Sequence, residues 1–297
     1  MRTFIGIDFS GDVTQWSENR RHSNVWICRT VVDGNKVHVT ELFRVQSCAG
    51  AGGSPFERLV VYLQKSDYAV AGIDAPFSVP REYVPPGGHA AILKLIADLT
   101  PNGRPFPTGA QLIAALAPPV APPGQKTYRQ TDKLWSRRGL NVRSTTWNGA
   151  RGGAPFAAAC MTLLHRAGLP MWPWSQQTNG LLAEAYPAAQ LLTWGLPSQG
   201  YAGDTDACLT TRREIIDALK VRLCLQLDEE TEDRLARYPD ALDSLVCSIA
   251  AIGAGLSRLS DPPVPDADAE GWIAVYPLPF RDRPFVEPPS PPPHDGA

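Results

Sequence analysis

The chain has 297 residues, of which 28 are Lys or Arg and 30 are Asp or Glu, so its formal net charge is −2. This balance excludes a protein that holds nucleic acid by bulk positive charge, although it allows a local basic segment. Hydrophobic residues make up 43%, which is enough for a sizeable core in one large domain or two small ones. We find neither a membrane span nor a signal peptide. With six cysteines and no C-x-x-C pair, we expect reduced thiols and a cytoplasmic protein without a membrane partner.

The first quarter of the chain predicts a small sheet with one helix. Two apolar runs each end in Gly-Ile-Asp, at Asp8 and at Asp74. Between them, two β-rich runs are joined by Asp33-Gly34-Asn35, a signal for a hairpin turn. We expect strands over residues 3–8, 25–30, 36–43 and 69–74, and a helix over 55–63 with Ser54 as its N-cap. This order favours an α/β fold with a mixed, α+β-like sheet.

A Pro-rich and basic segment follows the fourth predicted strand, over about residues 75–152. Two helices are expected in it, at 89–99 and 109–117, the second capped by Thr108 and Gln111. Its last part, 124–153, carries seven basic residues against one acid, with aromatic residues between them. Such a strip suits binding to phosphates and bases, although it also suits a solvated surface over buried tryptophans. The expected nucleic-acid contacts are Lys126, Arg129, Lys133, Arg137, Arg138 and Arg143.

The remainder alternates helices with strands and ends without core-forming residues. We expect helices over 154–167, 211–227 and 240–256, and strands over 181–186 and 271–276. The last of these helices is apolar almost all round, which is typical of a helix buried against a sheet. Residues 283–297 are Pro-rich, and we expect a disordered tail there.

Five acids stand where local propensity alone would not place them. Asp8 and Asp74 end apolar strands, Glu184 lies inside another, and Asp240 and Asp243 open the apolar C-terminal helix on one face. If the two Gly-Ile-Asp strands are parallel neighbours, their carboxylates meet at one edge of the sheet. A carboxylate cluster of this kind needs a cation, and hard oxygen ligands select Mg²⁺ or Mn²⁺. Two such ions could support phosphodiester hydrolysis.

Each acid also has an ordinary structural explanation. Asp240, directly after Pro239, could be a helix N-cap, and Asp243 could favour the helix dipole. Asp8 or Asp74 could cap the loop after its strand, and Glu184 could point to solvent from an edge strand. The joint pattern favours a shared site. Signatures of other chemistries are missing from the sequence: a Gly-x-Ser-x-Gly elbow, a Walker loop and His-Glu-x-x-His.

Several short motifs occur together in an order that resembles one known family. The chain is similar to the family called domain of unknown function 429, a predicted nuclease of the RNase H-like superfamily. The similarity spans residues 3 to 280. It rests on motifs at residues 6–11 (Gly-Ile-Asp-Phe-Ser-Gly), 72–80 (Gly-Ile-Asp-Ala-Pro-Phe-Ser-Val-Pro), 128–132 (Tyr-Arg-Gln-Thr-Asp), 184–187 (Glu-Ala-Tyr-Pro), 240–251 and 270–273 (Glu-Gly-Trp-Ile).

The resemblance implies an RNase H-like fold, in which helices flank a central five-stranded mixed sheet. It implies one such domain over residues 1–282, interrupted by the insertion at about 75–152. In this superfamily, two metal ions are bound by acids on the first strand, the fourth strand and the C-terminal helix. Asp8, Asp74 and the Asp240/Asp243 pair match those places, with Asp8, Asp74 and Asp243 as the metal ligands. Glu184 belongs to the family's own Glu-x-Tyr-Pro motif, and we count it with the catalytic acids.

Three functions are therefore compared. The first is a metal-dependent nuclease, a hydrolase that uses the five acids and binds DNA or RNA through the basic strip. The second is an ATP-dependent phosphotransferase related to actin-like ATPases and sugar kinases, for which a second phosphate loop and an adenosine motif are missing. The third is a non-catalytic module that binds nucleic acid or protein, with the acids as caps. The sequence favours the nuclease.

Overall fold

A computed structural model describes residues 1–48, 50, 52–99, 103–116, 126–175, 177, 179–256 and 267–277. Within these residues, seven strands form one mixed sheet in the order β5-β6-β4-β1-β2-β3-β7. The strands are β1 (Arg2–Asp8), β2 (Trp26–Asp33), β3 (Lys36–Arg44), β4 (Val70–Asp74), β5 (Met171–Trp172), β6 (Leu181–Glu184) and β7 (Leu225–Gln226). The protein therefore has an α/β fold, as expected from the sequence.

The sheet combines an antiparallel hairpin with parallel strands. β1 pairs antiparallel with β2, and β2 with β3, through the predicted turn at Gly34. β1 pairs parallel with β4, and β4 with β6. Two-residue strands, β5 and β7, extend the two edges. The sheet is thus wider than the five strands expected, because these very short edge pairs carry no signal in the sequence.

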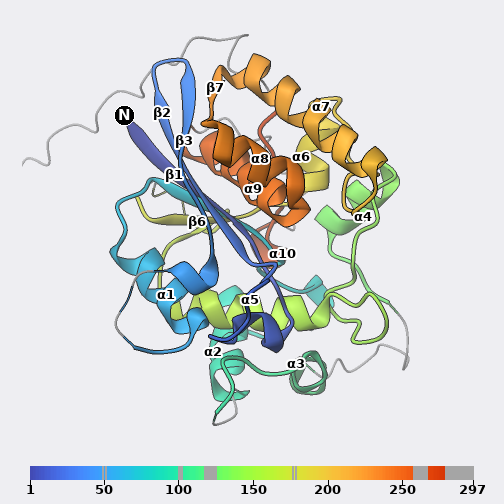
Figure 1. Cartoon of the computed structure of the whole chain (residues 1–297). Coiled ribbons are helices and arrows are strands. Elements are labelled where there is room, and N and C mark those ends of the chain that lie inside the picture. Colours follow the sequence, from blue (N-terminus) through green and yellow to red (C-terminus); the bar gives the residue numbers. More distant parts are fainter. Residues whose placement is uncertain are drawn as a thin grey trace, which may run out of the picture.

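Helices cover both faces of the sheet (Figure 1). They are α1 (Pro55–Lys65), α2 (Gly88–Leu99), α3 (Gly109–Leu116), α4 (Gln130–Arg137), α5 (Ala154–Ala167), α6 (Pro187–Thr193), α7 (Asp206–Leu223), α8 (Glu229–Arg237), α9 (Pro239–Gly255) and α10 (Ala267–Glu270). Short 3-10 turns are η1 (Val13–Trp16), η2 (Val45–Ser47) and η3 (Arg81–Tyr83). One core joins the sheet to α6–α9, and another joins its opposite face to α1, α2, α3 and α5. Because side chains alternate along a strand, Phe4 enters the first core, whereas Ile5 and Ile7 enter the second.

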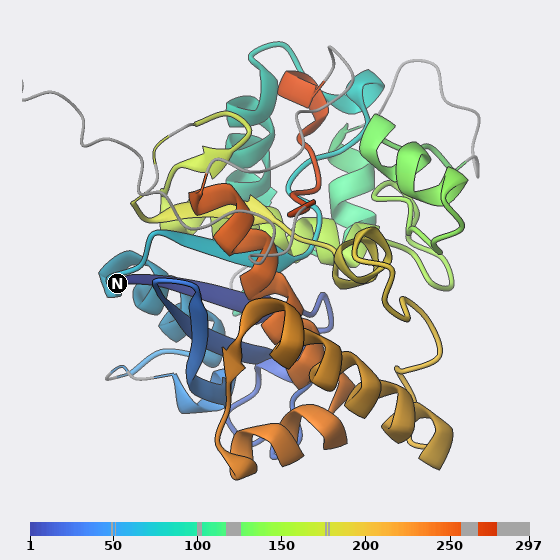
Figure 2. The same cartoon turned by 90° about the horizontal axis from the view of Figure 1, so that it is seen from above.

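The segment between β4 and α5 adds α2 and α3 to the face of the sheet that α5 covers. Its helices α2 and α3, coloured teal, lie on the opposite side of the molecule from the orange helices α7 and α8 (Figure 2). α2 and α3 pack against α5. Trp135 and Leu140, in and just after α4, form a small third core with Ile273 and Val275. The predicted insertion is therefore packed against the rest of the described structure.

The two Gly-Ile-Asp repeats explain how α9 approaches the sheet. Gly6 and Gly72 are register partners on β1 and β4. A Cβ atom on Gly6 would collide with the main chain of α9 at Ser244 and Ser248, and one on Gly72 with the carbonyl oxygen of Cys247. Glycine therefore lets the helix backbone approach the strands directly. Since residues i and i+2 share a face of a strand, the Asp that follows each Gly-Ile faces the same side as α9.

Local signals of the sequence are confirmed at several helix starts. At α1, Glu57 N–H donates to Ser54 Oγ and Ser54 N–H donates to the Glu57 carboxylate, at 3.4 and 2.8 Å. At α3, Thr108 and Gln111 exchange the same pair of bonds. The helix predicted over 154–167 has the bounds of α5.

Three expected elements differ from the structure. The helix expected over 211–227 is α7, which begins at Asp206 after the N-cap Thr205 and ends at Leu223, where Cys224 takes a left-handed conformation and leads into β7. Residues 271–276 form no strand, although Ala274 N–H donates to the carbonyl oxygen of Glu184. The N-cap of α9 is Tyr238, so Asp240 is not a cap but the second residue of the helix.

The expected tail, 283–297, lies outside the described residues. Among the helices that the structure does describe, none combines the length and the apolar character needed to cross a membrane.

Candidate metal centre

Three carboxylates meet at the carboxyl ends of the central parallel strands. Asp8 and Asp74 are register partners at the ends of β1 and β4, and Asp243 lies in the second turn of α9. One carboxylate oxygen from each residue lies within 4.8 Å of the other two. The expected convergence of these three acids is confirmed. The close approach of α9 over Gly6 and Gly72 is what brings Asp243 to the strand ends.

Burial and mutual repulsion act together on this triad. Burial raises the pKa of Asp8 well above its usual value, and the negative charges of Asp240, Asp243 and Asp74 raise it further. Burial and Asp243 likewise raise the pKa of Asp74, against the opposing effect of Arg143. Burial raises the pKa of Asp243 to about 7. Three ionised carboxylates at this separation need a compensating cation, and their hard oxygen donors fit Mg²⁺ or Mn²⁺.

Asp240 is the fourth acid of the group and lies at its margin. Burial raises the pKa of Asp240 to about 6, with Arg44 lowering it and Asp204 raising it. Asp240 lines the same pocket as the triad. The sequence correctly placed Asp240 and Asp243 near each other, because they are three residues apart on one helix.

Tyr201 is a site residue that sequence reasoning missed. Its hydroxyl donates to the Asp243 carboxylate at 2.8 Å, and the bond opposes the rise in the pKa of Asp243. The buried Arg212 of α7 holds the main chain of Tyr201 and donates to the carbonyl oxygens of Gly203 and Ala236 as well, at 2.7 and 2.5 Å. Tyr201 comes from the segment before α7, where no motif marks it.

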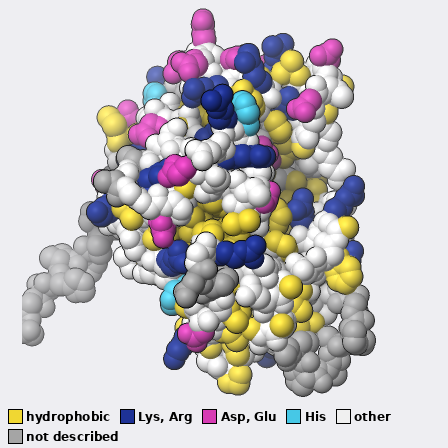
Figure 3. Space-filling view, turned by 60° about the horizontal axis from the view of Figure 1, so that its bottom comes forward, with side chains coloured by type: hydrophobic (Ala, Val, Ile, Leu, Met, Phe, Trp, Pro, Cys, Tyr) yellow, Lys and Arg dark blue, Asp and Glu magenta, His cyan; other side chains and the backbone are white. Residues whose placement is uncertain are grey.

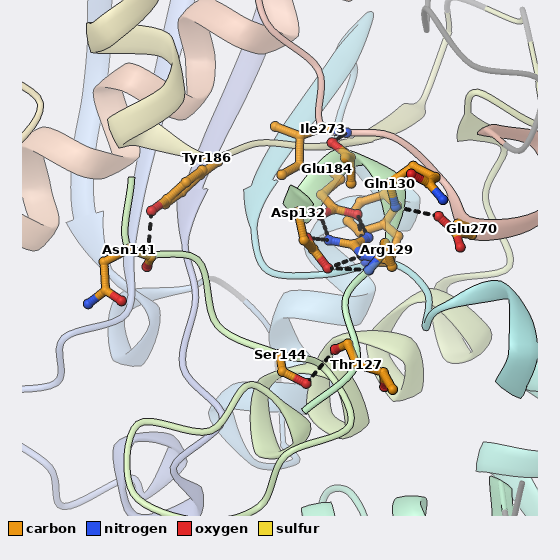
Figure 4. A network of polar contacts seen from close by, with 12 residues as sticks. Thr127, Arg129, Gln130, Asp132, Asn141, Ser144, Glu184, Tyr186, Glu270 and Ile273 are labelled. Carbon is orange, nitrogen blue, oxygen red and sulfur yellow. Dashed lines mark hydrogen bonds and ion pairs between the residues drawn. The ribbon is translucent and has the colours of Figure 1, made fainter. Parts of the chain in front are cut away.

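Glu184 belongs to a buried ion-pair network (Figure 4), which borders the pocket of the triad. Its two oxygens accept hydrogen bonds from the Arg129 guanidinium at 2.6 and 2.7 Å, and one also accepts from Phe77 N–H at 2.9 Å. The same guanidinium donates to both oxygens of Asp132, at 2.8 and 3.1 Å. Glu184 is 2% exposed, so the alternative in which it points to solvent is wrong.

Arg129 was expected to contact nucleic acid, and this expectation is wrong. The residue is 2% exposed and lies between Glu184 and Asp132. Its guanidinium is therefore occupied by two carboxylates inside the protein. The network joins the start of α4 to β6, and Glu270 ties the same region down by accepting from the N–H groups of Gln130 and Arg81, at 2.6 and 2.9 Å.

The other residues of the basic strip are exposed. Lys126, Lys133, Arg137, Arg138 and Arg143 all lie at the surface. A helix that shows the whole strip on one face is not formed, because α4 begins at Gln130 and ends at Arg137, so it carries two of the five.

Arg143 lies nearest to the acids. It lines their pocket, and its charge lowers the pKa of Asp74 and that of Tyr186, which burial otherwise raises. Its guanidinium lies over the ring of Phe156, 4.9 Å from the centroid. Arg143 is thus placed to face an anion bound at Asp74.

A pocket of about 360 Å³ lies over the carboxylates. It is lined by Asp8, Asp74, Asp240 and Asp243, by Arg143 and Tyr186, and at its side by the Arg129–Glu184–Asp132 network. All five acids singled out from the sequence therefore border one cavity. The triad could hold a cation, and Arg143 adds a positive group beside it.

Comparison with known proteins gives one match. The family model described as "Protein of unknown function (DUF429)" covers residues 21–267. No curated protein and no solved structure matches the chain.

Proposed function

The chain belongs to the DUF429 family, and we propose that it is a metal-dependent nuclease that hydrolyses phosphodiester bonds. The observation that carries this proposal is the meeting of Asp8, Asp74 and Asp243, with carboxylate oxygens within 4.8 Å of one another. Such a group suits one or two Mg²⁺ or Mn²⁺ ions. When bound, these ions would lower the pKa of an attacking water and stabilise the leaving oxygen.

The surrounding residues have separate roles in this proposal. Asp8, Asp74 and Asp243 bind the metal, and Asp240 completes the acidic side of the pocket. Tyr201 orients the Asp243 carboxylate through its 2.8 Å hydrogen bond. Arg143, which lies close enough to Asp74 to lower its pKa, attracts the phosphate to be cleaved. Glu184 is bound to Arg129 and Phe77, so we assign it to positioning the pocket wall rather than to catalysis.

The proposed RNase H-like fold has support from the placement of the acids. Asp8 ends the first strand, Asp74 ends the fourth, and Asp240 and Asp243 begin a helix near the end of the chain. The five longer strands form the central part of the sheet. This is the arrangement that the resemblance implies for a two-metal site.

A cleavage assay tests the proposal directly. Labelled single-stranded DNA, duplex DNA and RNA are incubated with the protein and Mg²⁺ or Mn²⁺, and products are resolved by electrophoresis. We expect cleavage of at least one substrate, and a loss of at least about a hundredfold in Asp8→Asn and in Asp74→Asn, because each removes a metal ligand. The matched control is Asp217→Asn, which changes an exposed acid on α7. We expect its activity to equal that of the wild type.

Metal binding is measured separately by thermal unfolding. Mg²⁺ or Mn²⁺ should raise the Tm of the wild type and of Asp217→Asn, and have a smaller effect on Asp8→Asn. Equal metal-induced shifts in all three proteins would contradict Asp8 as a ligand. Metal binding without cleavage of any substrate would contradict the nuclease proposal. ATP-dependent stabilisation would indicate the phosphotransferase instead.

A further inference from the structure

We propose that a second surface, an arginine-lined groove beside Asp240, binds the phosphate backbone of a nucleic-acid strand that crosses the metal centre. This inference rests on the proposed nuclease function. The groove has a volume of about 880 Å³. It is lined by Arg20, Arg21, Arg44, Arg234 and Arg237, together with Tyr238.

The groove brings together segments that are far apart in the sequence. Arg20 and Arg21 belong to the loop between η1 and β2, Arg44 ends β3, and Arg234 and Arg237 lie on α8. The sequence contains no basic run at these positions other than the Arg20-Arg21 pair. The tertiary structure therefore creates a positive surface separate from the basic strip.

Arg44 lines the groove and is held between two aromatic rings. Its guanidinium lies 4.3 Å from the ring centroid of Trp26 and 4.7 Å from that of Tyr238. Arg44 Nε also donates to the carbonyl oxygen of Ser23 at 2.9 Å. A guanidinium fixed in this way loses little side-chain entropy when it binds an anion, and its planar fork matches a phosphate.

The same residue connects the groove to the metal centre. The guanidinium of Arg44 lies over the ring of Tyr238, two residues before Asp240. Trp26 is the register partner of Asp8 across β1 and β2, and Tyr238 directly precedes α9. On the other side of β1 from β2, β4 ends in Asp74, and Arg143 lines the same pocket as this acid. A nucleic-acid strand whose phosphate lies at the acids would thus meet Arg44 on one side and Arg143 on the other.

The acids in the groove do not neutralise it. Glu18, Glu230 and Asp233 also line it, but they are fewer than the arginines. Glu18 is bound by Arg58, outside the arginine set. The pairs Arg234–Glu230 and Arg237–Asp233 span 3.2 and 3.0 Å between exposed side chains. Exposed pairs of this kind contribute about 0–1 kcal/mol, so a phosphate competes with them readily.

Positive and negative side chains are mixed over the visible surface, so a local cluster of arginines is a distinctive feature. Lys and Arg side chains, in dark blue, are interspersed with Asp and Glu over the face shown in Figure 3. The net charge of the chain is −2, so long-range attraction for a polyanion is weak. Binding to nucleic acid must therefore depend on local clusters of basic residues, such as the arginines of the groove.

Fluorescence anisotropy with a labelled single-stranded oligonucleotide, measured in EDTA over a series of salt concentrations, tests the groove. The variant is Arg20→Ala with Arg21→Ala, whose exposed side chains lie in a loop. We expect its Kd to rise about tenfold at low salt. The slope of log Kd against log salt should become shallower by about 1.4, since each lost contact to a single strand contributes about 0.7.

The matched control is Lys36→Ala with Lys65→Ala. It removes the same charge from exposed positions at the hairpin turn and the end of α1. Both positions lie toward the strand ends that are opposite to the ends that carry the acids. We expect the control to bind the oligonucleotide as the wild type does, apart from a small effect of net charge.

The outcomes separate this inference from the proposed function, because binding in EDTA requires no cleavage. Weaker binding and a shallower slope confined to the Arg20/Arg21 variant support the groove even if no substrate is ever cleaved. Equal Kd and slope in the variant and the control overturn it, even if the wild type is a nuclease. Absence of oligonucleotide binding by the wild type overturns it too. Tighter binding of poly-glutamate than of the oligonucleotide, lost in the same variant, would identify an acidic protein as the partner instead.

Discussion

At the scale of single residues, the acids of the pocket divide into two kinds. Asp8, Asp74 and Asp243 face one another, and burial and repulsion raise their pKa values. Glu184, in contrast, is neutralised by a buried guanidinium. The triad therefore needs a cation from outside the protein, whereas the charge of Glu184 is balanced by Arg129 within the protein.

The raised pKa values predict how stability depends on pH. An acid whose pKa is higher in the folded than in the unfolded protein binds more protons when folded, so its effect on stability declines as pH rises. As pH rises from the ordinary pKa of an Asp, near 4, to the pKa of about 7 for Asp243, the metal-free protein should become less stable. We expect its Tm to fall from pH 5 to pH 7.5 in EDTA.

Two comparisons check this prediction by calorimetry. Asp243→Asn should flatten the fall of Tm with pH, because the side chain keeps its shape and no longer ionises, while Asp217→Asn should not. Saturating Mn²⁺ should raise Tm more at pH 7.5 than at pH 5, since protons compete with the metal. A Tm that rises steadily with pH in EDTA would contradict the raised pKa values.

The buried network predicts a large effect for a small change. Glu184→Gln keeps the size of the side chain but removes the charge that faces Arg129 at 2.6 Å. Breaking a buried ion pair costs about 3–5 kcal/mol, and Asp132 still compensates part of the arginine charge, so we expect a loss of about 3 kcal/mol in the free energy of unfolding. Urea denaturation measures it.

The control for Glu184→Gln is Glu230→Gln, which breaks the exposed pair with Arg234. It should lower the free energy of unfolding by less than about 1 kcal/mol. If the two variants were equally stable, the Arg129 network would not hold the pocket wall as described.

At the scale of elements, the site depends on how closely α9 lies to β1 and β4. Gly72→Ala would place a methyl group against the carbonyl oxygen of Cys247 in the main chain of α9. The helix must then move, and overpacking of this kind typically costs about 1–3 kcal/mol, occasionally more. Since Asp243 moves with α9, we expect the metal-induced rise in Tm to shrink as well as the metal-free Tm to fall.

Gly34→Ala is the control for this effect. Gly34 lies in the hairpin turn with a φ of 57°, and a Cβ there meets no atom within 4 Å. It should cost about 1 kcal/mol through the backbone conformation alone and leave the metal-induced rise in Tm unchanged. A normal metal response in folded Gly72→Ala would show that the close approach of α9 is not needed for Asp243 to bind metal.

At the scale of the whole molecule, basic residues from different parts of the chain line two hollows, the pocket of the acids and the arginine groove. The segment between β4 and α5 provides Arg143, whereas the loop after η1, the end of β3 and α8 provide the arginines of the groove. The Arg129 network and Glu270 hold the start of α4 against β6 and the loop after β4. Arg143, farther along the same segment, lines the pocket of the acids.

The basic strip yields a prediction independent of the groove. Arg137→Ala with Arg138→Ala removes two exposed charges at the end of α4. We expect weaker oligonucleotide binding and a shallower salt dependence, because lost phosphate contacts release fewer counterions, with little change in Tm or metal binding. Anisotropy at two salt concentrations decides the matter. An unchanged Kd and slope would mean that the strip is a solvated surface.

Local patterns in the sequence determined much of the framework. Apolar runs that end in Asp8 and Asp74 predicted strands, and Ser54 and Thr108 predicted helix starts, because periodicity and capping act over a few residues. The nearness of Asp240 and Asp243 follows from one helical turn. The motif of Glu184 was also recognised, though not its role.

The tertiary structure alone decided which side chains meet across the chain. Arg129 and Glu184 are 55 residues apart, and Tyr201 and Asp243 are 42 apart. Arg44, at the end of β3, contacts the ring of Tyr238 just before α9. A basic residue within a basic segment has the sequence surroundings of a surface residue. Its sequence neighbours therefore do not reveal that it is buried in an ion pair with a distant carboxylate. Ion pairs and hydrogen bonds of this kind depend on how whole helices and strands pack. For α9, that packing depends on the close approach that Gly6 and Gly72 allow.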